Sequence, residues 1–399
     1  MDTGLSEVRN AFSRHLYVED DTFIDVGLAA VVAHRFSGDP VWLFLVGSSG
    51  SGKSEFLRSL NGDMIHHLSG LTSHTFVSGL NQPNKKDPSM LAALDGKVIV
   101  VKDLTAILSE NQKERSKIFG QLRDIYDGST ARAYGSGVGT RSYTCHVGFL
   151  AGVTPAIERY QTIDQVLGER FLNYRLRYAD PGKAVEAAMR NAGRQAEMRE
   201  ELGGRVRAFL SREWPKTTDA VTISKDDQEK IRHLAESLAW FRTGVSKNRS
   251  GNIQYMPETE IATRLVVQLT KLGCGLAIIQ GKSAYDENEF DILLRVARDS
   301  LPSIRERLLS SMHAHAEVDT GFQPTTEVAR DVGLPTSSTN VALDDLHVLG
   351  IVEKKGSNSY SWRLTKTTRY LLNYTGLLLS NKKLQPSVVQ FPGGARESM

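Results

Sequence analysis

A glycine-rich stretch near residue 50 holds the residues best suited to bind phosphate. Its spacing matches the phosphate-binding pattern G-x-x-x-x-G-K-[ST] at every fixed position, and glycines let backbone N–H groups curl around phosphate oxygens. A surface turn could match by chance, but this stretch also follows the apolar run 41–46 and precedes the helix-like segment 55–60. In such a loop the lysine reaches the β- and γ-phosphates, and the final hydroxyl ligates Mg²⁺. We predict that a nucleoside triphosphate binds at Gly47, Ser48, Ser49, Gly50, Ser51, Gly52, Lys53 and Ser54, with Ser54 on the metal ion.

Strand-like and helix-like segments alternate after residue 41, which is typical of a parallel sheet wrapped by helices. Before residue 41, the apolar residues within 8–16 and 26–32 predict two short amphipathic helices that cover one edge of the core. Residues 75–78 and 97–101 are predicted strands, the second because it is rich in β-branched residues. Residues 116–126 have a helical pattern, and 146–153 form the next buried strand. That strand leads to Thr154, whose hydroxyl would lie at the carboxyl edge of the sheet beside the phosphates.

The second half of the chain contains two regions whose predicted secondary structure differs from that of the α/β core. Residues 181–310 have helical patterns, with Ser224 placed to cap one helix and Asp286 to begin another, and we expect a lid on the α/β core. Residues 324–365 predict helix, turn, helix and hairpin, the order of a winged helix. A small helical cap with a hairpin is the alternative. We expect the tail 381–399, which contains Pro and Gly, to be disordered.

Composition narrows the class of protein. The chain has 399 residues, a formal net charge of +3 and 40% hydrophobic residues, so any basic surface must be local. Its two cysteines, Cys145 and Cys274, lack metal-ligand spacing and are expected to be reduced and buried. No apolar run approaches the ~20 residues of a membrane span, and the N-terminus is not that of a signal peptide. We expect a cytoplasmic protein with no membrane partner.

Four sequence motifs occur along the chain in an order that is typical of one protein family. The phosphate loop, Thr154, Gly168-Glu169-Arg170-Phe171 and Thr263-Arg264-Leu265 follow one another as expected of AAA+ ATPases. Within them the chain resembles the branch of MCM-type replicative helicases and NtrC-type activators. The stretches 122–134 and 146–155 are similar to the helix, hairpin and sensor strand of that branch, and the resemblance covers roughly residues 20–310. No origin-binding domain or zinc site precedes the core, which departs from full-length MCM proteins.

The resemblance implies roles for single residues and a cofactor. Thr154 would be sensor 1, where an asparagine is usual, and Arg264 would be sensor 2. Arg170 would be an arginine finger that stabilises the transferred phosphoryl group of a neighbouring copy. The alternative for both arginines is an ordinary salt bridge. A finger acting in trans requires a ring or spiral, for which we expect a hexamer with ATP and Mg²⁺.

The acidic motif departs from the family. An apolar strand ending in Asp-Glu is expected, but the chain has Lys102-Asp103-Leu104 after the strand. Asp103 could bind Mg²⁺ in the Asp position, or it could occupy the position of the Glu that activates water. Glu110 or Glu114 could contribute from the following loop. A single carboxylate predicts slow or partner-dependent hydrolysis.

Two regions are candidates for DNA contact. Arg132, Tyr134 and Arg141 belong to a glycine-rich hairpin, which in the resembling helicases projects into the central pore. There the arginines would follow the phosphate backbone and the tyrosine would stack on a base. A solvated loop is the alternative. In the winged helix the candidates are Ser338 and Asn340 on the second helix and Lys354 and Lys355 on the wing.

Asp344 and Asp345 lie on that same second helix and would repel DNA, so the module could instead dock a protein. Taken together, the sequence predicts an AAA+ α/β core over 1–180, a helical lid over 181–310, a winged helix over 311–380 and the tail. We expect an oligomeric, DNA-dependent ATPase that is helicase-like and acts in the replication of DNA, such as the DNA of a mobile element. The alternatives are a non-motor ATP switch that loads or regulates partners on DNA, and a remodeller of proteins.

Overall fold

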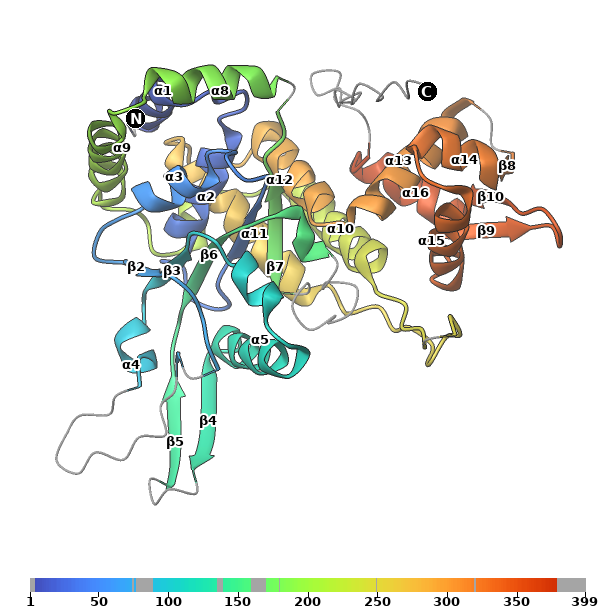
Figure 1. Cartoon of the computed structure of the whole chain (residues 1–399), viewed down its shortest axis with the longest axis horizontal. Helices are drawn as coiled ribbons and strands as arrows, with labels where there is room; N and C mark the ends of the chain where they lie inside the picture. The colour runs from blue at the N-terminus through green and yellow to red at the C-terminus, as the bar shows by residue number, and fades with distance from the viewer. Residues whose placement is uncertain are drawn as a thin grey trace, which may run out of the picture.

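A parallel sheet surrounded by helices forms the body of the protein, and a smaller group of helices and strands lies at its C-terminal end (Figure 1). The computed structural model describes residues 4–73, 75–76, 89–134, 139–158, 170–178, 180–248, 250–318 and 321–378. The predicted tail 381–399 and Gly168-Glu169 lie outside the described residues. Of the predicted strand 75–78, residues 75 and 76 are described and are not in a strand.

The sheet has five strands in the order β2-β3-β6-β1-β7, and all neighbouring pairs are parallel. Val46, at the end of β1, pairs in register with Val153 of β6 and Arg175 of β7. The carboxyl ends of these strands therefore meet at one edge, as the sequence predicted for a parallel α/β core. The strands are β1 (Trp42–Val46), β2 (Ile65–Leu68), β3 (Val98–Val101), β6 (Gly148–Val153) and β7 (Phe171–Arg175).

Two hydrophobic cores cover the two faces of the sheet. Leu43 and Leu45 of β1 pack in the core formed with α2 (Thr22–Ala33), α3 (Lys53–Ser59) and α11 (Thr263–Ile279). Trp42 and Phe44 face the opposite core, which contains α5 (Gln112–Tyr126). We expected α2 to cover one edge as an amphipathic helix, but it is apolar and buried along nearly its whole length. It lies between the sheet and α11, so both of its sides need apolar residues.

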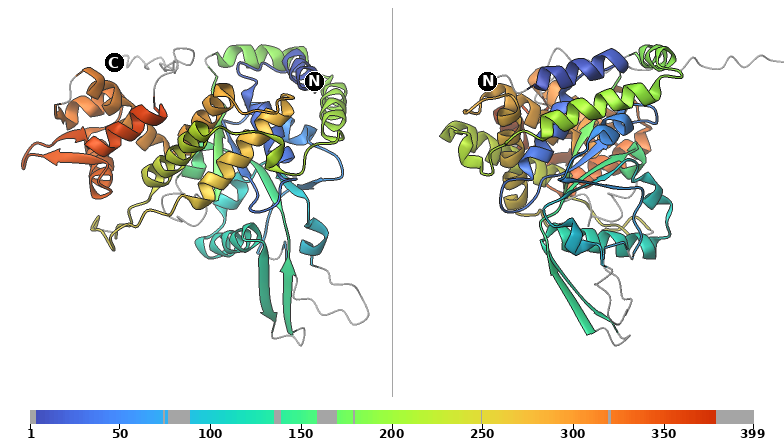
Figure 2. Two further views of the ribbon diagram at one scale, coloured as in Figure 1. Left: turned by 180° about the vertical axis from the view of Figure 1, so that it is seen from behind. Right: turned by 90° about the vertical axis from the view of Figure 1, so that its left-hand side faces the viewer.

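The glycine-rich segment after α5 forms a two-stranded antiparallel hairpin of β4 (Ser129–Tyr134) and β5 (Gly139–Thr144). It extends away from the body, as Figures 1 and 2 show from three sides. A hairpin was predicted here from the resemblance.

Most of the remaining body is helical, and the predicted helix starts are confirmed. The Ser224 side chain accepts a hydrogen bond from the Asp227 N–H, and Asp286 with Glu289 forms a capping box. Helix α9 packs against α1 and α3, so this helical segment shares a core with the N-terminal helices. The helices are α1 (Leu5–His15), α4 (Leu91–Leu94), α8 (Pro181–Arg190), α9 (Gln195–Leu210), α10 (Lys225–Arg242), α12 (Glu287–Asp299) and α13 (Ser303–Val318), with 3-10 turns η1 (Thr105–Ser109), η2 (Pro155–Ile157) and η3 (Thr218–Ala220).

The C-terminal group contains the predicted helix, turn, helix and hairpin in that order. The second helix packs on the first, and the hairpin follows directly. The sequence did not predict the short strand β8, which extends the hairpin to the sheet β8-β10-β9, or the last helix α16. The elements are β8 (Gln323–Pro324), α14 (Thr325–Val332), α15 (Thr336–Val348), β9 (Val352–Lys355), β10 (Ser361–Leu364) and α16 (Lys366–Thr375).

Candidate functional site

The predicted phosphate loop connects β1 to α3 at the carboxyl edge of the sheet. Lys53, the first residue of α3, is buried, and its Nζ donates a hydrogen bond to the Ser48 carbonyl 2.8 Å away. Burial lowers the pKa of Lys53, and the charge of Asp103 acts in the opposite direction. The lysine therefore reaches back across the loop, with the Asp103 carboxylate near enough to influence it.

Backbone geometry explains the glycines of this loop. Gly50 and Gly52 have φ values of 82° and 74°, in the left-handed region that favours glycine. A Cβ atom on Gly47 would lie 2.6 Å from Ser51 Oγ, so that position is shaped for a residue without a side chain. The same Ser51 Oγ is buried and has no hydrogen-bond partner among the described residues. The loop therefore has no room for a side chain at Gly47 and is lined by the unpaired Ser51 hydroxyl. Both features fit the binding of a phosphate group.

Tyr178 contacts the phosphate loop and was not predicted from the sequence. Its hydroxyl donates to the Ser51 carbonyl at 2.8 Å, and burial raises the pKa of Tyr178 to about 12. The phenol therefore stays protonated and holds the loop from the side of the segment after β7. The residue lies 127 positions from Ser51, so no local sequence signal could have identified it.

Asp103 and Thr154 lie together at the same edge, as predicted. The exposed Asp103 carboxylate accepts a hydrogen bond from the Thr105 N–H at 2.8 Å. The Thr105 hydroxyl in turn accepts one from the Thr154 N–H at 3.1 Å, which ties the ends of β3 and β6 together. Leu104 is buried, so the residue after Asp103 faces the core. Glu110 is exposed, and Glu114 forms an ion pair with Lys117.

Ser54 and Asp103 provide a hydroxyl and a carboxylate for the expected magnesium ion. Both are accessible to solvent, since Asp103 is exposed and Ser54 is partly buried. This fits Mg²⁺, which usually takes one or two protein ligands together with phosphate oxygens and keeps several waters. In the described part of the chain, no group of three or more His, Cys, Asp and Glu residues could hold a metal ion by itself.

The two candidate arginines lie at the other end of the sheet. Arg170 directly precedes β7, whose first residue pairs with Trp42 at the start of β1. Its guanidinium donates to both oxygens of Asp127, at 3.1 and 2.9 Å, and its side chain is 9% exposed. Arg264 lies 3.9 Å from Glu260, and both guanidinium groups lie over the ring of Tyr126. The arginines therefore form one cluster, which is separate from the phosphate loop of the same chain.

Both arginines have unused hydrogen-bonding capacity. Arg170 Nε and Arg264 Nη1 are buried and lack an acceptor within the ranges that the structure describes. Unsatisfied buried donors are costly, and they often mark a site that another molecule completes.

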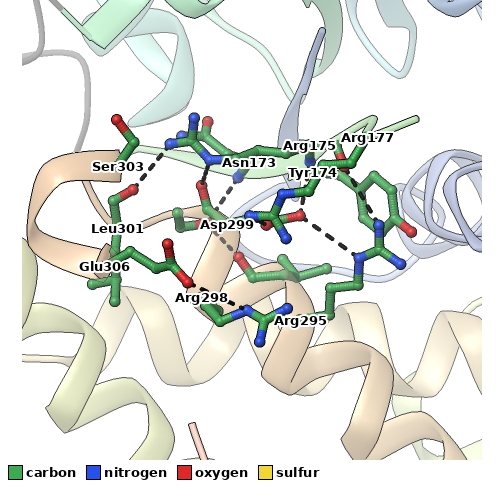
Figure 3. A network of polar contacts seen from close by, with 12 residues as sticks. Asn173, Tyr174, Arg175, Arg177, Arg295, Arg298, Asp299, Leu301, Ser303 and Glu306 are labelled. Atoms are coloured by element: carbon green, nitrogen blue, oxygen red, sulfur yellow. Dashed lines mark hydrogen bonds and ion pairs between the residues drawn. The ribbon is translucent and has the colours of Figure 1, made fainter. Parts of the chain in front are cut away.

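A buried polar network lies at the carboxyl end of β7 (Figure 3). The sequence did not predict it. Asp299 is fully buried and accepts hydrogen bonds from the Arg175 N–H and from Arg177, both at 2.8 Å. Arg175 also pairs with Glu158, which accepts hydrogen bonds from the Ser303 N–H and hydroxyl at the start of α13. Glu158 directly follows η2, which connects to the end of β6 through Thr154. The network therefore links the end of β6 to α12 and α13.

The hairpin brings its three DNA candidates to one face. Arg132 pairs in register with Arg141, and Tyr134 pairs with Gly139. Because alternate residues of a strand share a face and cross-strand partners lie side by side, positions 132, 134 and 141 lie on the same face. The small residues Ala131 and Ser142 pair at positions on the other face.

The four C-terminal candidates for DNA contact differ in exposure and in the partners that they already have. Ser338 and Lys355 are exposed, but Asn340 donates to Asp344 at 3.2 Å and Lys354 pairs with Asp344 at 2.6 Å. Lys354 also lies over the Tyr360 ring, 3.6 Å from its centroid. The acidic residues that we expected to repel DNA are thus neutralised within the protein, since Asp345 pairs with Lys247. The same pairing occupies Asn340 and Lys354.

Comparison with known protein families and with curated proteins found no match. Among the helices that the structure describes, none has the length and apolar character required to cross a membrane. Cys145 and Cys274 are both free and buried.

Proposed function

We propose that the protein is an oligomeric AAA+ ATPase that binds ATP and Mg²⁺ and acts on DNA in a helicase-like manner. The observation that carries the proposal is the loop between β1 and α3, where the charge of Asp103 acts on the buried Lys53. Asp103 is in turn connected through Thr105 to Thr154. Lys53 would bind the β- and γ-phosphates. Ser54 and Asp103 would hold Mg²⁺, which neutralises charge on the phosphates when bound.

The position of the arginines supports assembly. From Trp42 to Val46 strand β1 rises roughly 13 Å at about 3.3 Å per residue, and Arg170 and Arg264 lie at the far end from the loop. Neither is placed to reach the phosphates bound by its own chain. In the proposed mechanism Arg170 exchanges its contact with Asp127 for the phosphoryl group bound to a neighbouring copy, where its charge stabilises the transition state.

The hairpin of β4 and β5 supports the DNA-directed part of the proposal. It extends from the body and has two arginines and a tyrosine at positions on one face, a combination suited to phosphate contacts and base stacking. We also propose that the C-terminal group is a winged helix that contacts DNA through Ser338 and Lys355, with the helical region 181–310 forming the lid.

A non-motor ATP switch is the second candidate, and the acidic motif favours it. Asp103 is followed by the buried Leu104, so one carboxylate would have to serve both the metal ion and the attacking water. In this case ATP binding would drive assembly, and hydrolysis would be slow.

The test is ATP turnover with and without single-stranded and double-stranded DNA. We expect DNA to stimulate the wild type, Lys53→Ala to lose turnover, and the double variant Arg132→Ala/Arg141→Ala to keep basal turnover while losing the stimulation. Phosphate contacts predict that this stimulation weakens with added salt. ATP-dependent assembly with negligible turnover that is indifferent to DNA would exclude the motor and favour the switch.

A further inference from the structure

A buried side-chain amide lies against the candidate arginine Arg170. Gln268, on α11, is fully buried, and its Nε2 donates a hydrogen bond to the Arg170 carbonyl oxygen 2.8 Å away. Because a carbonyl oxygen only accepts hydrogen bonds, this contact fixes which end of the amide faces Arg170. The other end, Oε1, is buried and has no hydrogen-bond partner among the residues that the structure describes. A buried amide is costly unless it is hydrogen-bonded, and the bond that this one makes is to the backbone of Arg170.

Gln268 also lies next to the second candidate arginine. It follows Arg264 by four residues on α11, so the two side chains share one face of the helix, one turn apart. The guanidinium carbons of Arg170 and Arg264 lie 5.6 and 5.9 Å from the centre of the Tyr126 ring. Helix α11 therefore carries one arginine and holds the backbone of the other, which sets the position of the two relative to each other.

The two ends of Arg170 are held in different ways. Its guanidinium contacts Asp127, whose side chain is 49% exposed, and in the proposed mechanism this contact is exchanged for a phosphoryl group. Its carbonyl is held by Gln268 on a helix that packs against α2 and α10. The hydrogen bond from Gln268 does not have to break when the guanidinium changes its partner. Gln268 can therefore keep the backbone of Arg170 in place throughout the exchange.

We propose that Gln268 is a positioning residue for Arg170, which it aligns with Arg264 toward the phosphoryl group bound by a neighbouring copy. The inference rests on the proposed function, in which Arg170 acts on that group. A misplacement of about 1 Å at a reacting centre can lower a rate roughly 100-fold. Since the phosphate loop lies at the other end of the sheet, Gln268 should affect the rate of hydrolysis and leave nucleotide binding by its own chain unchanged.

The chain offers a matched control on the same helix. Gln268→Met removes the hydrogen-bond donor and keeps an unbranched side chain of similar length. Lys271 is also buried on α11, and its Nζ donates to the carbonyl oxygens of Ser37 and Gly38 at 3.1 and 3.2 Å, away from the arginines. Lys271→Met therefore removes a buried donor from α11 without touching Arg170. Urea unfolding would verify that both variants are folded and would compare their stability.

The test measures ADP affinity, ATP turnover at saturation, and turnover in mixtures of variants. We expect Gln268→Met to bind ADP like the wild type and to turn over ATP at least about tenfold more slowly, whereas Lys271→Met matches the wild type in both. Mixing Gln268→Met with Lys53→Ala should restore turnover, because Lys53→Ala supplies well-placed arginines to an intact loop. Mixing it with Arg170→Ala should not, because neither variant supplies a well-placed Arg170.

Three results would show that Gln268 does not position Arg170: wild-type turnover by Gln268→Met, an equal loss of turnover in Lys271→Met, or recovery in the mixture with Arg170→Ala. Each of these leaves the proposed ATPase standing. Absence of ATP hydrolysis in the wild type, or full turnover by Arg170→Ala, would instead overturn the proposed shared site, and the role of Gln268 with it.

Discussion

Two residues of the candidate site are cations with buried side chains. Lys53 and Arg170 are both buried cations, and each contacts a group of the same chain, the Ser48 carbonyl and Asp127 respectively. A buried charge without such partners would be strongly destabilising. Both contacts would have to be exchanged for phosphate oxygens during the proposed reaction, so they hold the side chains until ATP binds.

The burial of His34 predicts how the free energy of unfolding depends on pH. It is buried against the ring of His146, with centroids 4.3 Å apart, and burial, His146 and Lys271 lower the pKa of His34 to about 3. In the unfolded chain the pKa of histidine is about 6.5, so between these values only the unfolded state binds the proton. The free energy of unfolding should therefore fall as pH decreases below 6.5, by up to about 1.4 kcal/mol per pH unit for this group.

Urea denaturation at pH 6.5 and 4.5 would test this, with His34→Gln for comparison. The variant should lose less stability than the wild type over that range. Asp25, whose pKa burial raises to about 6, contributes with the opposite sign but is present in both proteins. Equal losses in the two proteins would show that His34 does not govern the acid response.

The sequence could predict those site residues whose roles follow from local spacing. The glycines, Lys53 and Ser54 lie within one loop, and Asp103 and Thr154 follow buried strands whose ends must meet in a parallel sheet. Tyr178 and the Glu158–Arg175–Asp299 network could not be predicted, because their contacts join residues far apart in the chain. The cluster of Arg170 and Arg264 around Tyr126 likewise depends on tertiary packing.

At the scale of elements, the packing of α11 on α2 makes a second prediction. A Cβ atom on Gly275 would lie 2.6 Å from the Ala29 carbonyl oxygen, which is backbone and cannot rotate away. Gly275→Ala should therefore force the helices apart and lower the free energy of unfolding by about 1–3 kcal/mol.

The matched control is Gly204→Ala in α9, an exposed position where the added methyl group meets no atom within 4 Å. There the gain in helix propensity should raise stability by up to about 1 kcal/mol. Urea unfolding of both variants measures the contrast. If Gly275→Ala is as stable as Gly204→Ala, the two helices do not pack as closely as described.

Elements were predicted well where the local signal was strong. The caps at Ser224 and Asp286 and the β-branched strand β3 agree with the sequence. The amphipathic assignment of α2 was wrong, because periodicity cannot distinguish a helix covered on one side from one packed between a sheet and another helix. Strand β8, with only two residues, carries too little pattern to be recognised.

In the whole molecule, the phosphate loop and the two candidate arginines lie at opposite ends of one sheet. The loop, Lys53 and Asp103 lie at the carboxyl ends of the strands, and Arg170 and Arg264 lie at the amino ends. Under the proposed function, such a molecule would complete its ATP site only with a neighbouring copy, and each added copy would present the same two ends again. The central claim is therefore that one active site is shared between two copies.

Mixing two inactive variants tests this claim most directly. Lys53→Ala keeps its arginines but lacks a working loop, and Arg170→Ala has an intact loop but lacks the arginine. If the site is shared, each variant alone should be nearly inactive, and a one-to-one mixture should regain roughly a quarter of wild-type turnover, because random neighbours restore about that fraction of interfaces. A mixture no more active than the two variants alone, or full turnover by Arg170→Ala, would contradict a shared site.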